Sequence, residues 1–91
     1  MPRFRYGQVD GVPYLTIDAE DWTYVRRADD MCVYLRKTLP DTVLASAIGR
    51  RIADVVEIPG IGGRRIAAAE PVITAGLRQT MLRIGGATNP D

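Results

Sequence analysis

The sequence has no histidine and a single cysteine, Cys32, among its 91 residues. One cysteine excludes an internal disulfide and is typical of a reducing compartment. A chain with one cysteine and no histidine also lacks the nitrogen and sulfur ligands that a zinc site needs. Without histidine, any general acid–base chemistry would depend on carboxylates. We therefore expect a non-enzymatic protein with no catalytic residue, no metal and no cofactor, and we expect Cys32 to lie in the core.

Net charge and long apolar runs are also scarce. Twelve basic and eleven acidic residues give a formal charge of +1, so the whole molecule has no strong field that would attract a polyanion. The N-terminal segment lacks the apolar core of a secretion signal, and no apolar run approaches the length that spans a membrane. The sequence predicts a soluble cytoplasmic protein without a membrane partner.

What is present is an ordinary globular composition, with 46% apolar and 25% charged residues. A chain of this length forms one domain and buries only a modest core. We therefore expect a single small domain over residues 1–91. Because so small a core cannot bury every apolar side chain, we also expect the domain to associate with copies of itself, most simply as a dimer.

Residues 3–17 are expected to form a β-hairpin. Asp10 and Gly11 favour the positive φ angles of a tight two-residue turn. Pro13 has no N–H to donate, which predicts that the second strand of the hairpin is an edge strand. The turn fixes the expected register, in which these pairs face each other: Val9 with Val12, Gln8 with Pro13, Tyr6 with Leu15, and Phe4 with Ile17.

Apolar residues recur at spacings of three and four in three later segments, which predicts helices over residues 19–38, 41–57 and 71–84. Within the first helix, the segment "MCVYL" would be a short strand if the helix breaks near Asp29 and Asp30. The predicted fold class is α+β, an N-terminal two-stranded β-hairpin packed on three or four α-helices.

The expected core joins one face of the hairpin to the apolar faces of the helices. The remaining C-terminal segment, residues 85–91, is expected to be a polar tail. The core prediction comprises nine large apolar side chains: Phe4, Tyr6, Leu15, Ile17, Trp22, Val25, Leu35, Ile48 and Ile52.

The acidic residues are the remaining candidates for catalysis or for a magnesium site with oxygen ligands. They cluster in and after the segment "DAED", where Asp18 can cap a helix and the next acidic residues suit the positive end of that helix. Capping explains this pattern without a catalytic role. The residues concerned are Asp18, Glu20, Asp21, Asp29 and Asp30.

Residues 56–69, "VEIPGIGGRRIAAA", contain the strongest functional motif. The core of this stretch, "IPGIGGRRI", resembles the hairpin of helix-hairpin-helix DNA-binding modules, and the resemblance extends over residues 52–69. It implies two short helices joined by a hairpin whose backbone amides and one basic residue, Arg64, bind a phosphate of DNA without reading bases. The binding residues that this resemblance implies are Gly60, Ile61, Gly62, Gly63, Arg64 and Arg65.

Two functions from different classes remain open at this point. The first is a small non-enzymatic protein that binds the nucleic-acid backbone through residues 58–65. The second is a homo-oligomeric interaction or assembly module with no nucleic-acid role, which contacts a copy of itself or another protein through its edge strand and apolar surfaces. The glycine-rich stretch would then be a linker between helices, or a turn between short strands "VVEI" and "RRIAA".

Overall fold

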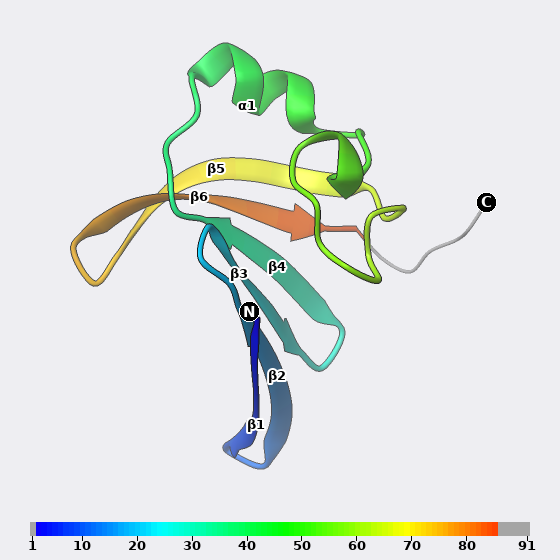
Figure 1. Ribbon diagram of the computed structural model, residues 1–91, viewed down its shortest axis with the longest axis vertical. Helices are drawn as coiled ribbons and strands as arrows, with labels where there is room; N and C mark the ends of the chain where they lie inside the picture. The colour runs from blue at the N-terminus through cyan, green and yellow to red at the C-terminus, as the bar shows by residue number, and fades with distance from the viewer. Residues whose placement is uncertain (1, 86–91) are drawn as a thin grey trace.

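A computed structural model of the protein describes residues 2–85 (Figure 1). It contains six β-strands, one α-helix and one short 3-10 helix within that range. The elements in chain order are β1 (Arg3–Val9), β2 (Val12–Asp18), β3 (Trp22–Arg27), β4 (Asp30–Leu35), α1 (Asp41–Ala47), η1 (Ile52–Asp54), β5 (Ile66–Thr74) and β6 (Leu77–Ile84). The fold is therefore mostly antiparallel β-sheet, and the predicted α+β fold with three or four helices is wrong.

The six strands form one antiparallel sheet in the order β1-β2-β3-β4-β6-β5. Strands β1 to β4 follow one another as hairpins, and β5 and β6 form a further hairpin that joins the sheet through β6. The long connection between β4 and β5 carries both helices, and Figure 1 shows it arching over one side of the sheet. Strands β1 and β5 are the two edges.

The N-terminal hairpin has the predicted register, with Val9 opposite Val12 and Phe4 opposite Ile17. Asp10 and Gly11 have φ angles of 53° and 79°, as a tight turn of this kind requires. The prediction that the second strand is an edge is wrong, because β2 also pairs with β3. Pro13 is tolerated because this second pairing begins only at Tyr14.

The helix predicted over residues 19–38 is wrong, since this segment forms strands β3 and β4. The two strands are joined by a two-residue turn in which Ala28 has a φ of 55°. The alternative for "MCVYL" is confirmed, because β4 spans Asp30–Leu35. Asp18 consequently ends a strand and caps no helix.

Residues 71–84 also form no helix. They belong to β5 and β6, which are joined at Ala75 and Gly76, with φ angles of 51° and 80°. The end of the predicted element at residue 84 agrees with the end of β6. Of the predicted tail, Gly85 follows β6, and residues 86–91 lie outside the described residues.

The helix predicted over residues 41–57 is much shorter than expected. Helix α1 ends at Ala47, and Ile48 is already extended with a ψ of 129°. The φ of the next residue, Gly49, is 89°, a conformation that glycine adopts at little cost and that ends a helix. The chain resumes helical geometry only briefly, in η1.

Alternation along the strands gives the sheet two different faces. The covered face lies beneath α1, η1 and the loop that follows, and its side chains form a cluster with Ala47, Ile52 and Ile58. The other face, here called the open face, is crossed by ion pairs, including those from Asp18 to Arg36 and from Asp30 to Arg83. The strand residues of the covered cluster are Trp22, Tyr24, Met31, Val33, Leu35, Ile66, Leu82 and Ile84.

The predicted core is confirmed at its centre and wrong at its margins. Trp22, Leu35 and Ile52 are buried, whereas Leu15, Ile17 and Val25 are half-buried, and Val25 lies on the open face. The remaining predicted members, Phe4, Tyr6 and Ile48, are exposed. On the hairpin, the buried cluster includes Trp22 and Tyr24 of β3, and Leu15 and Ile17 of β2 pack against its margin, but among the described residues it includes none from β1.

Candidate functional site

The glycine-rich loop between η1 and β5 is part of the cover over the sheet. Ile58 is buried in the core cluster, and Ile61 packs against that cluster from the loop. The segment before the loop is a three-residue 3-10 helix, and the segment after it is strand β5. The arrangement is not a helix-hairpin-helix, and this part of the sequence-based interpretation is wrong.

Backbone pairing explains why no helix pair forms here. Residues 49–53 run antiparallel to residues 62–66, and Arg51 faces Arg65 in a β-bridge. The N–H groups of Ile52 and Ala53 donate to the carbonyls of Arg64 and Gly62, at 2.9 and 3.0 Å. The N–H and C=O groups that would form hydrogen bonds within a helix therefore form them between residues 49–53 and residues 62–66.

The six predicted binding residues all lie in this loop or at its end, but they differ in exposure. Gly60, Gly63 and Arg65 are exposed, whereas Ile61, Gly62 and Arg64 are half-buried. A Cβ added to Gly62 would lie 3.2 Å from the Cβ of Ala53, so this glycine allows the loop to approach η1 closely. Gly62 therefore allows close packing of the loop against η1, and not the close approach to a DNA phosphate that the resemblance implies.

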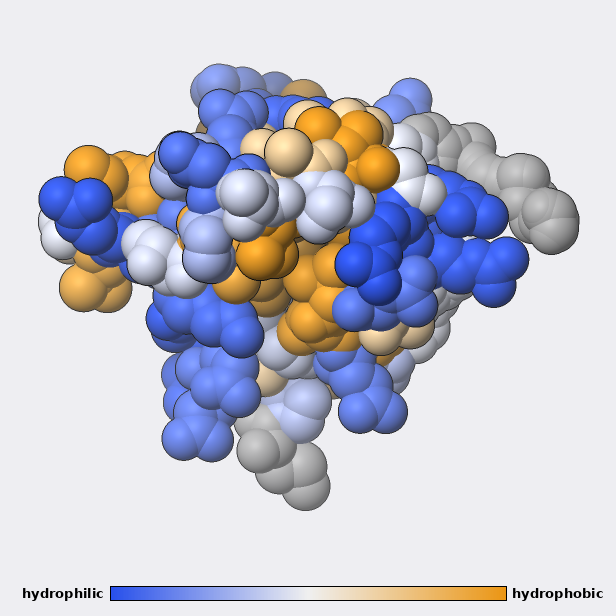
Figure 2. Space-filling view, turned by 90° about the horizontal axis from the view of Figure 1, so that it is seen from above, coloured by the Kyte–Doolittle hydropathy of each residue, from blue (hydrophilic) through white to orange (hydrophobic). Residues whose placement is uncertain are grey.

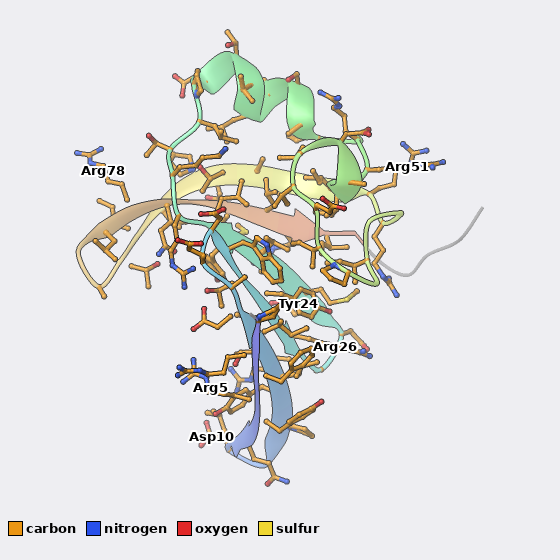
Figure 3. The ribbon with its side chains drawn as sticks, viewed as in Figure 1. Arg5, Asp10, Tyr24, Arg26, Arg51 and Arg78 are labelled. Atoms are coloured by element: carbon orange, nitrogen blue, oxygen red, sulfur yellow. The ribbon has the colours of Figure 1, made fainter. Side chains whose placement is uncertain are left out.

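The β-bridge has one consequence that the sequence did not reveal. It places the pair Arg50 and Arg51 beside the pair Arg64 and Arg65, and we call these four residues the arginine cluster. Arg65 donates from Nη1 to the carbonyl of Gly49 at 3.0 Å. Figure 3 shows Arg51 projecting from this end of the molecule, and Figure 2 shows strongly hydrophilic side chains gathered on the same side.

Two further ionisable side chains, Asp54 and Tyr24, interact with this cluster. Arg50 forms an ion pair with Asp54 at 3.9 Å, between half-exposed side chains. On the covered face, burial raises the pKa of the Tyr24 phenol, and the positive charges of Arg26 and Arg64 oppose that rise. Arg64 therefore lies close enough to the core to affect a buried side chain, which makes it a poorer probe of surface binding than Arg51.

Two of the five acidic candidates, Asp18 and Asp30, form structural ion pairs, with Arg36 and Arg83. Asp18 accepts hydrogen bonds from Thr23 and from Arg36, and these bonds hold the pKa of its carboxyl below the usual value. Arg36 also donates to the carbonyls of Ala19 and Glu20, so that it ties together the turn between β2 and β3. Within residues 2–85, no group of three or more cysteine or acidic side chains is placed to hold a metal ion.

Cys32 is buried, as expected, although it lies on the open face of the sheet. Burial, with a contribution from the nearby carboxylate of Asp30, raises the pKa of its thiol. A raised pKa keeps the sulfur protonated and weakly nucleophilic at neutral pH. Its neighbour across the sheet, Arg83, is paired with Asp30.

The outer side of β1 is the second candidate surface. Phe4 is 57% exposed and Tyr6 is 76% exposed, and both belong to the face that is buried elsewhere in the sheet. Leu15 and Ile17 continue this surface inward as half-buried side chains that pack against the core. The sequence correctly predicts that these four residues share a face of the hairpin. It does not predict that this face extends past the covering segment and is exposed at Phe4 and Tyr6.

Comparison of the chain with protein-family models, with curated proteins and with solved structures gives no match. No helix within residues 2–85 has the length and the apolar character needed to cross a membrane. Inferences about function therefore depend on the two surfaces described above, the arginine cluster and the outer side of β1.

Proposed function

We propose that the chain is a non-enzymatic assembly module in which the β1 edge of the sheet associates with a second copy of the chain. One observation carries this proposal, the gradient of exposure across the covered face. Side chains on β4 are fully buried, with Val33 at 0% and Leu35 at 1%, whereas Phe4 and Tyr6 on β1 are among the most exposed apolar residues. An apolar sheet face that reaches an open edge is a surface that another chain can cover.

The chemistry of the edge supports the same interpretation. An edge strand presents N–H and C=O groups that have no partner within its own sheet, and pairing with another strand satisfies them. A net charge of +1 causes little long-range repulsion between copies. Arg5 carries a positive charge at this edge, and the carboxylate of Asp18 in its own chain, 3.9 Å away, offsets part of that charge.

Sedimentation velocity across a concentration series tests the proposal. The wild type should form dimers at micromolar concentration, and Tyr6→Lys should weaken association at least tenfold because it places a charge in the apolar surface. A matched control is Ile73→Lys, since Ile73 is 70% exposed and lies on β5 at the far edge. A wild type that remains monomeric at high micromolar concentration refutes the proposal, as does equal weakening by both variants.

A second function, binding to the phosphate backbone of a nucleic acid, is favoured by the arginine cluster. Like charges directly opposite each other in a β-pair destabilise it, so the facing of Arg51 and Arg65 is a feature that an anion would stabilise. Arginine binds phosphate through two parallel hydrogen bonds. This mode differs from a helix-hairpin-helix, because the two arginine pairs are brought together by strand pairing.

Fluorescence anisotropy with labelled duplex and single-stranded DNA at low salt tests this second function. Binding should weaken with salt, and Arg51→Glu should weaken it about equally for unrelated sequences and reduce the salt slope by about one phosphate contact. Arg78→Glu is the matched control, because Figure 3 places Arg78 at the opposite end of the molecule. Absence of binding by the folded wild type at low salt rejects this function.

The cytoplasmic location predicted from the sequence belongs to the proposal as well. Its support is the free and buried state of Cys32, which is compatible with a reducing compartment. Fractionation of cells that express a tagged chain would test it, and recovery of the chain outside the cytoplasm would contradict it.

A further inference from the structure

We propose a specific pairing for the dimer: the two β1 strands run antiparallel, with Tyr6 facing Tyr6 of the second copy. This inference depends on the proposed assembly function and defines the geometry of the same surface. It would join two six-stranded sheets into one continuous sheet whose apolar faces lie on the same side.

The hairpin turn determines which backbone groups of β1 point outward. In a tight two-residue turn the flanking residues, Val9 and Val12, exchange hydrogen bonds. Hydrogen-bonded and non-hydrogen-bonded pairs alternate along an antiparallel ladder, so Gly7 and Arg5 also direct their N–H and C=O groups toward β2. The groups of Phe4, Tyr6 and Gln8 are therefore the ones directed away from the sheet.

The requirement for one continuous apolar face limits the possible registers. Residues opposite each other in an antiparallel pair project their side chains to the same face. Phe4 and Tyr6 lie on the covered face, and Arg3 and Arg5 lie on the open face. Even-numbered residues of one copy must then face even-numbered residues of the other, so a two-fold axis passes through a residue and not between residues.

Charge distinguishes among the symmetric registers that remain. A register centred on Arg5 places Arg5 opposite Arg5, and one centred on Phe4 places Arg3 opposite Arg5. Both put like charges face to face, which destabilises a strand pair. The register centred on Tyr6 avoids this, because Arg5 then faces Gly7 and Arg3 faces Val9.

Backbone pairing also favours the Tyr6-centred register. Phe4 then faces Gln8 of the second copy, so all three outward-directed residues of each strand find partners. A register centred on Gly7 would instead place Phe4 opposite Asp10, which is in the turn with a φ of 53° and cannot continue a strand. The Tyr6-centred register therefore makes the most hydrogen bonds without opposing arginines.

The absence of a side chain at Gly7 fits this geometry. The ring of Tyr14 crosses the strand at Gly7, and its hydroxyl oxygen lies 2.6 Å from the position that a Cβ would occupy. Arg5 of the second copy lies opposite Gly7 on that same open face. The guanidinium group can then pack against the Tyr14 ring, an arrangement that arginine and aromatic side chains favour.

Disulfide trapping at single positions tests the register. Hydrogen-bonded opposite residues have Cα atoms about 5.5 Å apart, within the range that a disulfide spans. Tyr6→Cys should cross-link rapidly under mild oxidation. Phe4→Cys should not, because Phe4 and its copy lie four residues apart along the strands, about 13 Å. Cys32 is buried, so the wild type serves as the background control.

Spin labels at Asp10→Cys provide a second measurement that leaves Tyr6 intact. The Tyr6-centred register separates the two Asp10 positions by about 27 Å, whereas a Phe4-centred register separates them by about 41 Å. A dimer that cross-links through Phe4→Cys or Arg5→Cys, or that gives the longer distance, overturns this register and leaves the assembly function standing. A wild type that stays monomeric in sedimentation removes both.

Discussion

Replacing Ala28 or Ala75 by glycine should stabilise the protein, which is the reverse of the usual effect of this substitution. Both alanines occupy the first position of a two-residue turn, with φ angles of 55° and 51°. An L-residue with a side chain loses about 1 to 2 kcal/mol in this left-handed region, and glycine does not. Glycine is more flexible in the unfolded chain, which offsets about 0.5 to 1 kcal/mol of that gain. We expect a net gain of about 0.5 to 1 kcal/mol for each substitution.

Thermal and urea unfolding of the two variants would measure this gain. For a domain of this size the expected rise in Tm is about 2 to 8 °C per substitution. The effects should add in the double variant, because Figure 1 places the β3–β4 turn and the β5–β6 turn far apart. Ala45→Gly, at an exposed position of helix α1, is the matched control and should lose about 1 kcal/mol. Destabilisation of the turn variants by a similar amount would show that these turns do not have positive φ angles.

Three further predictions concern the core, the open face and the thiol. Ile52→Ala should reduce the free energy of unfolding by about 2 to 5 kcal/mol in urea titrations, because Ile52, in η1, is fully buried between the covering segment and the sheet. Asp18→Asn should reduce the loss of unfolding free energy that the wild type shows as pH falls into the acid range. Since Thr23 and Arg36 lower the pKa of Asp18, its contribution is complete at neutral pH and is lost as pH falls below the ordinary carboxyl value and through the lowered one. Cys32 should react with a thiol reagent at least a hundredfold more slowly in the native protein than in denaturant, and equal rates would contradict its burial.

The hairpin was predictable from sequence because its turn is chemically distinctive. Asp10 and Gly11 are residue types that adopt positive φ readily, and the register follows directly from the turn. The β3–β4 and β5–β6 turns have alanine at the corresponding first position. Because alanine is a good helix former, the sequence predicts continuous helices through Ala28 and Ala75, where the structure has two strand pairs.

The middle of the sheet also lacks the alternation that identifies strands. Val25, Cys32 and Met81 are apolar residues on the open face, so β3, β4 and β6 have apolar side chains on both faces. Apolar residues at spacings of three and four then occur by chance, because apolar side chains are not restricted to alternate positions of these strands. A local pattern cannot distinguish such strands from a buried helix.

The arginine cluster depends on pairing between distant segments, which no local pattern records. The sequence shows Arg51 and Arg65 in two separate basic pairs, and each pair is typical of a solvated surface. The glycine-rich motif is a loop, as the sequence predicts, but it joins a three-residue 3-10 helix to a strand and not two helices. The glycines and arginines of the motif indicate the position of the candidate site, and the backbone hydrogen bonds from Ile52 and Ala53 determine the shape of the loop.

The Arg51–Arg65 bridge also bears on how the chain can change in length. Because these residues face each other, the segment between them leaves the sheet region and returns to the same place. An insertion at Gly60, which is exposed and has no neighbour within 4 Å of an added Cβ, would enlarge the loop without shifting any strand. Doubling the length of a flexible loop costs only about 0.6 kcal/mol of closure entropy. The fold therefore offers one position where a peptide tag or a longer natural loop can be accommodated while Ile58 and Ile61 still seal the core.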